Sequence, residues 1–184
     1  MLVEHTAIEG VKIVTPKRHG DNRGFFSEVY NRRTWLQAGL EYDFVQDNHS
    51  LSAEVGTIRG MHFQTPPFEQ AKLVRVSRGR VLDVVVDIRR SSPTFGRHVA
   101  VELSAENWRQ LLVPAGFAHG FCTLEPNTEF LYKVTNFYSA PNDRGLAFDD
   151  PDLGIDWPVA PDRAHLSDKD RKWPRLRDLV DAFA

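Results

Sequence analysis

The sequence predicts an all-β protein folded as an antiparallel jelly roll of two facing sheets, with a few short peripheral helices. Short β-type runs follow one another along most of the chain, and Gly, Pro, Asn or Ser stands in most of the gaps. Helical patterns are few, which argues against layers of helices packed on a sheet. About ten strands also exceed what one open sheet carries comfortably, so two sheets are expected.

The chain order of the predicted elements is simple, because each run is bounded by turn-forming residues. Two helical segments are expected before the C-terminal quarter: 32–38, which Gly39 ends, and a single turn at 104–108. The predicted strands are 11–16, 24–30, 44–50, 57–64, 71–78, 80–88, 98–103, 111–113, 116–124 and 129–136.

The C-terminal quarter differs in composition from the rest. From Asp149 onward the chain is richer in proline and charge, and the amphipathic stretch 176–183 predicts a helix. We expect one domain over 1–184, with 149–184 wrapped around the outside of the roll. The edges of two sheets must be covered, and pairing with a second copy of the chain would give a symmetric homodimer.

Composition limits the classes of partner. The 184 residues are 41% hydrophobic and 26% charged, as in a soluble domain, and the formal net charge is −2. There is no basic block, no membrane-length apolar stretch and no N-terminal targeting pattern. The lone Cys122, in an apolar run, predicts a buried inert thiol and a reducing compartment. We therefore expect a cytoplasmic protein with neither nucleic acid nor membrane as a partner.

The most informative stretch is 58–64 (IRGMHFQ), followed shortly by Lys72. Strand interiors seldom bury titratable groups unless these are paired or in use. In a regular strand Arg59 and His62 point to opposite faces, so a shared pocket requires a bend, which Gly60 permits. An isolated His62 would most often be a core histidine bonded to a carbonyl, but the surrounding cluster favours proton transfer.

Further polar side chains lie among apolar neighbours. Lys72 either extends to the rim of the sheet or serves as a fixed cation near a developing negative charge. His119 shares a strand face with two phenylalanines, and Asp83 lies in a very apolar strand, so these two are expected to pair. Tyr132 is either a core tyrosine with one hydrogen bond or a general acid opposite a histidine base.

Asp170 has two competing interpretations. Ser167 and Asp170 have the spacing of a helix capping box, and spacing alone favours that structural role. The alternative is a carboxylate that orients His62, fixes its tautomer and stabilises the imidazolium once a proton arrives.

A metal site is not expected. The stretch 114–119 (PAGFAH) resembles the second half of a metal-binding cupin motif. The first half should supply His-x-His and a following Glu, whereas the chain has HFQ at 62–64. Two histidines without an obvious carboxylate leave the ligand set incomplete.

A set of motifs, in order along nearly the whole chain, carries a family resemblance. They are 21–26 (DNRGFF), 46–50 (QDNHS), 59–64 (RGMHFQ), 70–76 (QAKLVRV), 92–96 (SPTFG), 114–121 (PAGFAHGF) and 150–158 (DPDLGIDWP). Together they resemble the dTDP-4-dehydrorhamnose 3,5-epimerase family. The resemblance implies a cupin-like jelly-roll homodimer without a cofactor, which inverts C3 and C5 of dTDP-4-keto-6-deoxyglucose on the path to dTDP-rhamnose.

The resemblance also implies roles for the residues already singled out. His62 is the base, Asp170 its orienting partner, and Tyr132 the acid that returns a proton on the opposite face of the sugar. Both carbons lie beside the C4 ketone, so loss of either proton gives an enolate, which Lys72 would stabilise.

Other matched positions imply contacts to the sugar nucleotide. Tyr138 matches an aromatic residue that stacks on thymine, and Arg23 is expected to reach the neighbouring subunit's site. Where the family usually has a Glu, this chain has Asp143, which we leave outside the predicted site. The remaining matched positions that grip the substrate are Glu28, Gln46, Asn48, Arg59, His119 and Lys169.

Three alternatives stay open at this point. An enzyme of the same fold could epimerise only C3 or only C5 of a related keto-sugar. A metal-dependent cupin enzyme and a non-catalytic sugar-nucleotide-binding jelly roll are the others. Hydrogen exchange at C3 and C5 distinguishes the first and third alternatives from the double epimerase, and metal analysis of the purified protein decides on the second.

Overall fold

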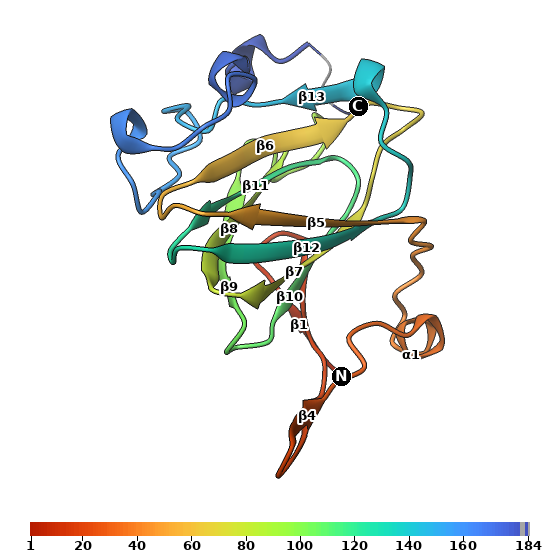
Figure 1. Cartoon of the computed structure of the whole chain (residues 1–184). Coiled ribbons are helices and arrows are strands. Elements are labelled where there is room, and N and C mark those ends of the chain that lie inside the picture. Colours follow the sequence, from red (N-terminus) through yellow and green to blue (C-terminus); the bar gives the residue numbers. More distant parts are fainter. Residues whose placement is uncertain (181–182, 184) are drawn as a thin grey trace.

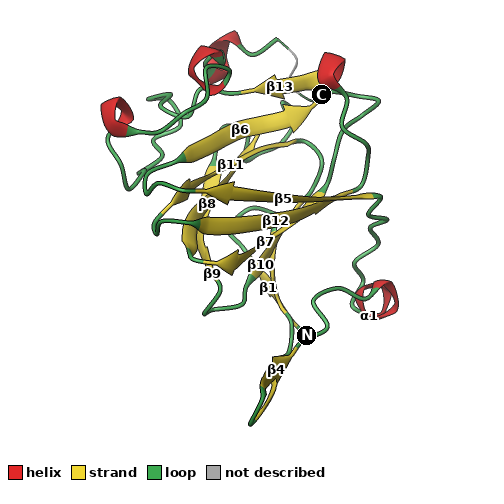
Figure 2. Ribbon diagram, in the orientation of Figure 1, coloured by secondary structure: helices red, strands yellow, loops and turns green. Residues whose placement is uncertain are grey.

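Two antiparallel sheets lie face to face and enclose the core, as Figures 1 and 2 show. The computed structural model describes residues 1–180 and 183. One sheet has the strand order β1-β2-β10-β7-β12-β5 and the other β13-β6-β11-β8-β9. Neighbouring strands in both sheets run antiparallel, so the predicted double-sheet roll is confirmed.

The elements have the following bounds. The first sheet contains β1 (Leu2–His5), β2 (Lys12–Thr15), β10 (Gln110–Val113), β7 (Lys72–Arg78), β12 (Thr128–Val134) and β5 (Gln46–Ser52). The second contains β13 (Asp143–Gly145), β6 (Ile58–Gln64), β11 (Phe117–Thr123), β8 (Arg80–Asp87) and β9 (His98–Ser104). A separate hairpin joins β3 (His19–Asp21) to β4 (Gly24–Phe26). The helices are α1 (Arg32–Gln37) and the 3₁₀ turns η1 (Ala140–Asn142), η2 (Pro161–Arg163), η3 (Asp170–Lys172) and η4 (Leu176–Asp178).

Each predicted run contains a strand, although the run 24–30 is a strand only at β4. The sequence reading missed β1, β3 and β13, which have three or four residues each and are too short to show an alternating pattern. The predicted helix at 32–38 is confirmed as α1. The Asn31 side chain accepts hydrogen bonds from the Arg33 and Thr34 N–H groups and so caps its first turn.

Period-two alternation decides which side chains enter the core. In β7, Val74 and Val76 join the cluster between the sheets, whereas Leu73 packs on the outer face of the six-stranded sheet. Lys72 therefore shares the inner face with the valines, as predicted. On the outer face α1 buries Trp35.

The segment after Asp149 packs on the outer face of the five-stranded sheet. The side chains of Leu153, Leu179 and Phe183 pack against the hydrophobic cluster on that face. The predicted helix at 176–183 is wrong, because among the described residues of that range only η4 is helical. Positions 181 and 182 lie outside the described residues. Arg90 holds this end of the chain instead: its guanidinium donates to the Leu179 carbonyl, which the helix would have used, and its N–H donates to the Phe183 carbonyl.

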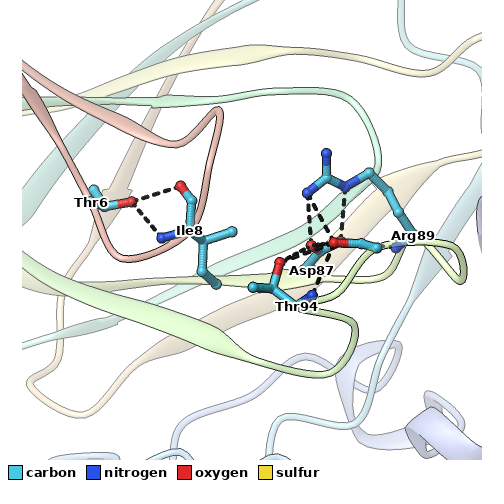
Figure 3. A network of polar contacts seen from close by, with 6 residues as sticks. Thr6, Ile8, Asp87, Arg89 and Thr94 are labelled. Atoms are coloured by element: carbon cyan, nitrogen blue, oxygen red, sulfur yellow. Dashed lines mark hydrogen bonds and ion pairs between the residues drawn. The ribbon is translucent and has the colours of Figure 1, made fainter.

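The motif at 92–96 forms a loop that is tied to a buried carboxylate (Figure 3). Asp87 accepts from the Arg89 guanidinium at 2.7 Å and from the hydroxyls of Ser92 and Thr94, both at 2.6 Å. Burial works to raise the pKa of Asp87, but these donors outweigh it and lower the pKa to about 2. The Arg89 guanidinium also lies 4.5 Å from the centre of the Phe117 ring, so the loop supports the start of β11.

Two predictions from composition are also tested by the structure. Cys122 is buried, and burial raises the pKa of its thiol to about 11, which makes it inert as predicted. Among the described residues, no helix is long and apolar enough to span a bilayer.

Candidate active site

One cavity of about 690 Å³ opens between the two sheets and the C-terminal segment. Strands β6 and β11 form one wall, β7 and β12 the facing wall, and residues 165–171 close it from the side. The predicted site residues among its lining are Arg59, His62, Lys72, His119, Tyr132, Tyr138, Lys169 and Asp170.

The predicted bend in β6 is present at Gly60. Its φ is +144°, and a Cβ atom there would lie 2.5 Å from the Gly120 Cα of the neighbouring strand. The register of β6 with β11 shifts at this point, between His119 and Phe121. Because of this irregularity Arg59 and His62 both line the cavity, although a regular strand would have pointed them apart.

His62 and Asp170 form a close pair across the chain. His62 Nε2 lies 2.6 Å from Asp170 Oδ1, and Asp170 is 5% exposed. Burial works to raise the pKa of Asp170, but bonds from His62, Trp173 and the Ser167 hydroxyl together hold that pKa below its usual value. With Nε2 committed to Asp170, Nδ1 is the ring nitrogen left for a substrate.

The two interpretations of Asp170 are compatible. The Asp170 N–H donates to Ser167 Oγ at 3.1 Å, which is one of the two bonds of the predicted capping box, although the turn η3 begins only at Asp170, with Lys169 at its N-cap. The Asp170 carboxylate meanwhile bonds His62. The backbone of Asp170 is therefore fixed by the cap while its side chain serves the imidazole.

Lys72 crosses from the facing sheet. Its ammonium donates to the His62 carbonyl oxygen at 3.2 Å, and its burial lowers the pKa to about 8 while Asp143 and Asp83 act in the opposite direction. A cation is thus held beside the base, without the extension to the rim that was the alternative.

The predicted His119–Asp83 pair is confirmed at the inner end of the cavity. His119 Nε2 lies 2.9 Å and 3.0 Å from the two Asp83 oxygens, and Asp83 is fully buried. Burial raises the pKa of Asp83, and this effect exceeds the opposing ones of His119 and Lys72. The pair satisfies two polar groups that would otherwise be costly to bury.

Tyr132 approaches from β12. Its ring packs on the core cluster, and its hydroxyl has no hydrogen-bond partner among the described residues, unlike that of a typical core tyrosine. Burial raises the pKa of the phenol, so it keeps its proton at neutral pH. An O–H group that lines the same cavity as the base, on the facing sheet, is suited to act as an acid.

A polar cluster joins the cavity mouth to the C-terminal segment. Asp143 accepts from the Tyr138 hydroxyl at 3.0 Å and pairs with the Lys169 ammonium. The Gln46 side chain accepts from the Tyr138 N–H, and Gln64 accepts from the Ser139 N–H, so both hold the loop that carries Tyr138. Asp143 was left outside the predicted site because it departs from the family's usual Glu, yet its carboxylate lies in this cluster.

Four predicted residues do not line the cavity. Gln46 and Asn48 lie beside it on β5, where Asn48 is the direct cross-strand neighbour of Tyr132. Arg23 lies in the β3–β4 hairpin, is 85% exposed and pairs with Asp21. Glu28, also exposed, bonds Asn31.

No metal-binding group is evident in the part of the chain that the structure describes. Nowhere in that part do three His, Cys, Asp or Glu side chains gather closely enough to hold an ion. The carboxylates near the cavity are bonded to His62, His119 and Lys169.

The family model described as dTDP-4-dehydrorhamnose 3,5-epimerase matches residues 5–178. The chain belongs to the dTDP-4-dehydrorhamnose 3,5-epimerase family. A member from Shigella flexneri is 53% identical over 171 residues, which cover 92% of this chain and 93% of the relative. The family resemblance read from the motifs is thereby confirmed.

Solved structures of family members agree in fold. A dTDP-4-dehydrorhamnose 3,5-epimerase from Bacillus anthracis, with TDP and PPi bound, is 50% identical, with a TM-score of 0.92 over 95% of this chain and 98% of that one. A dTDP-6-deoxy-D-glucose-3,5-epimerase from Legionella pneumophila, in complex with dTDP-4-keto-L-rhamnose, is 44% identical, with a TM-score of 0.92 over 98% of this chain and 94% of that one. The jelly roll is therefore the cupin-like roll of this epimerase family.

Proposed function

We propose that this protein epimerises dTDP-4-dehydro-6-deoxy-D-glucose at C3 and C5 through enolate intermediates and so makes dTDP-4-dehydro-L-rhamnose for dTDP-rhamnose biosynthesis. The observation that carries the proposal is that His62 and Tyr132 enter one cavity from facing sheets. Inversion needs a base on one side of the ring and an acid on the other. The names and bound ligands of the relatives support the substrate.

The proposed chemistry follows from the contacts of each group. His62 Nδ1 takes the proton from the carbon, and the electron pair of that C–H bond moves to the ketone oxygen. Asp170 stabilises the imidazolium, and the Lys72 ammonium stabilises the enolate oxygen. Tyr132 then gives its proton to the same carbon from the opposite side. To reset the site, the His62 imidazolium releases its extra proton to solvent and the Tyr132 phenolate takes one up.

The remaining lining residues would hold the nucleotide. Arg59 is braced by bonds to Ser52 and to the Leu51 carbonyl, so its guanidinium is fixed near the cavity. Tyr138 is 59% exposed at the mouth, as a residue that stacks on thymine would need to be. Lys169 and His119 would complete the polar contacts, with Gln46 and Asn48 at the β5 edge.

The substrate-binding roles of Arg23 and Glu28 require a homodimer. Within the described residues the β3–β4 hairpin forms a sheet of its own and projects from the body (Figure 1), and Phe25 and Phe26 on β4 are 54% and 71% exposed. Such an apolar arm suits insertion against a second copy, where it would present Arg23 to the partner's cavity.

Two further parts of the proposal concern organisation. We treat residues 1–184 as one domain, since residues 165–171 supply a wall of the cavity that the strands begin. The single buried cysteine fits a reducing cytoplasm, where we place the enzyme.

Incubation with dTDP-4-keto-6-deoxyglucose in D₂O, followed by NMR, tests this function. Deuterium at both C3 and C5, with the rhamnose configuration as product, is the expected result. Label at only one carbon would identify a mono-epimerase, and binding without label would identify a non-catalytic sugar-nucleotide-binding protein.

A further inference from the structure

Trp173 lies directly behind Asp170, outside the lining of the cavity. Its indole N–H donates to Asp170 Oδ1 at 3.2 Å, and this is the same oxygen that lies 2.6 Å from His62 Nε2. The indole and imidazole rings stand nearly edge to face, with centroids 6.2 Å apart. We propose that Trp173 is a positioning residue that fixes the Asp170 carboxylate and, through it, the His62 imidazole. This inference rests on the proposed role of His62 as the base.

The indole is itself held on several sides. Gly145 stands opposite His62 in the β13–β6 register, and a Cβ atom there would lie 2.4 Å from the indole ring, so the ring occupies the space that a side chain would fill. The Lys169 ammonium lies 5.3 Å from the ring centre. The Ala147 N–H donates to the Pro174 carbonyl, which fixes the backbone beside the indole.

These contacts restrict the rotation of the Asp170 carboxyl group, which the His62–Asp170 pair alone would leave free. The capping contact with Ser167 fixes the backbone of Asp170 but not the rotation of its carboxyl group. The indole N–H selects the orientation in which Oδ1 meets both donors. Since a second donor stabilises the carboxylate, it also weakens the pull of Asp170 on the imidazole proton. Loss of the indole N–H should therefore free the Asp170 carboxyl group to rotate. It should also make His62 easier to protonate, because Asp170 then attracts the imidazole proton more strongly.

Other charged groups surround the dyad from each neighbouring element. They are Lys72 on β7, His119 on β11, Asp143 on β13, and Lys169 and Arg171 in the C-terminal segment. A change confined to the indole N–H leaves all of them in place, so their effects cancel in a comparison with the wild type.

The test is Trp173→Phe, which keeps an aromatic ring on Gly145 and beneath Lys169 but removes the N–H. Trp157→Phe is the matched control, because Trp157 lies in the same segment, outside the cavity lining, and its indole N–H donates to the Phe148 carbonyl at 2.8 Å. For each protein, the pH midpoint of the His62 ring is measured by NMR on histidine-labelled protein. The pH profiles of kcat and kcat/KM are measured in parallel.

For Trp173→Phe we expect a higher His62 midpoint and an acid limb of kcat/KM displaced to higher pH. We also expect kcat to fall about ten- to a hundredfold, the range for one lost hydrogen bond to a charged group, with KM nearly unchanged. Trp157→Phe should change none of these. Gly145→Ala, which displaces the indole without altering it, should shift the midpoint in the same direction as Trp173→Phe.

A wild-type midpoint and wild-type kcat in Trp173→Phe would overturn the inference. Equal losses in Trp173→Phe and Trp157→Phe at every pH would overturn it as well, because they would reflect stability alone. The His62 titration needs no substrate. It therefore separates a failure of this inference from a failure of the proposed epimerisation.

Discussion

His62 uses one ring nitrogen to bond Asp170 and keeps the other free to react with a substrate. Tyr132 and Lys72 likewise each keep a group that can react. Tyr132 is partly buried, its hydroxyl has no hydrogen-bond partner among the described residues, and burial raises its pKa, so it holds a proton that it can donate. The Lys72 ammonium makes one bond, to the His62 carbonyl, and retains further donors for an enolate oxygen. Each of these three side chains therefore has a defined atom free to react.

Replacing His62 by alanine removes the proposed base for both carbons. We expect deuterium exchange at C3 and at C5 to fall together by about 10²–10⁴-fold, the usual worth of a positioned proton-transfer group. The measurement is NMR of the keto-sugar in D₂O, with the folded state checked by circular dichroism. Full exchange in His62→Ala would refute the assignment.

Replacing Tyr132 by phenylalanine should separate two steps that the wild type joins. The base still removes the proton, so exchange continues, but the proton no longer returns from the opposite face and inversion falls much further than exchange. Comparing deuterium incorporation with product configuration in the same sample checks this. Equal losses of exchange and inversion would contradict the role of Tyr132 as the acid.

Lys72 should set an alkaline limit to activity. Burial lowers its pKa to about 8, so in the free enzyme the ammonium loses its proton, and with it the stabilisation of the enolate, as the pH rises through that value. The pH profile of kcat/KM should therefore fall above about pH 8, which is its alkaline limb. The Lys72→Met variant should be slow, and its profile should lack this fall. An unchanged alkaline limb in Lys72→Met would assign it to another group.

At the scale of elements, the bend in β6 is the feature on which the site depends. Gly60→Ala would place a methyl group 2.5 Å from the Gly120 Cα, at a φ of +144°. We expect a loss of about 3 kcal/mol in the free energy of unfolding, from strain and overpacking together. Gly24→Ala is the control, since its φ is +131° and nothing lies within 4 Å of the added Cβ. Denaturant titrations that give equal losses for both variants would exclude the contact with Gly120 as the cause.

Elements with strong alternation could be predicted from sequence, and the exceptions have physical reasons. The pattern of β7 correctly placed Lys72 on the same face as Val74 and Val76, because seven residues show the period clearly, but only the structure shows that this is the inner face. β13 has three residues and pairs with β6, far away in sequence, so local pattern could not reveal it or the contacts of Asp143. The helix predicted at 176–183 failed because tertiary contacts took the place of helical hydrogen bonds.

The candidate site could be predicted less completely than the fold. The spacing of Ser167 and Asp170 predicted the contact between them. The bond from Asp170 to His62, which spans 108 positions, was the less favoured of two interpretations until the family resemblance supported it. Trp173 matched no motif, since its importance comes from contact with Gly145 and Asp170 in space.

At the scale of the whole molecule, the proposed dimer makes a prediction about mixing. Arg23→Ala and His62→Ala proteins should each be impaired, but a mixed dimer would contain one cavity with both an intact His62 and the partner's intact Arg23. Unfolding and refolding an equal mixture should restore up to about a quarter of wild-type activity, because half of the dimers are mixed and each has one intact site. If the mixture is no more active than its components, Arg23 acts within its own chain.

The wall formed by residues 165–171 has a consequence for biosynthesis. Every strand that shapes the cavity precedes this wall in the chain, and Asp170, the partner of His62, belongs to it. A nascent polypeptide that has emerged only as far as β13 can pair its strands, yet it still lacks the carboxylate. Catalytic competence therefore comes only after the roll has been translated, so a ribosome-stalled intermediate of that length would be inactive.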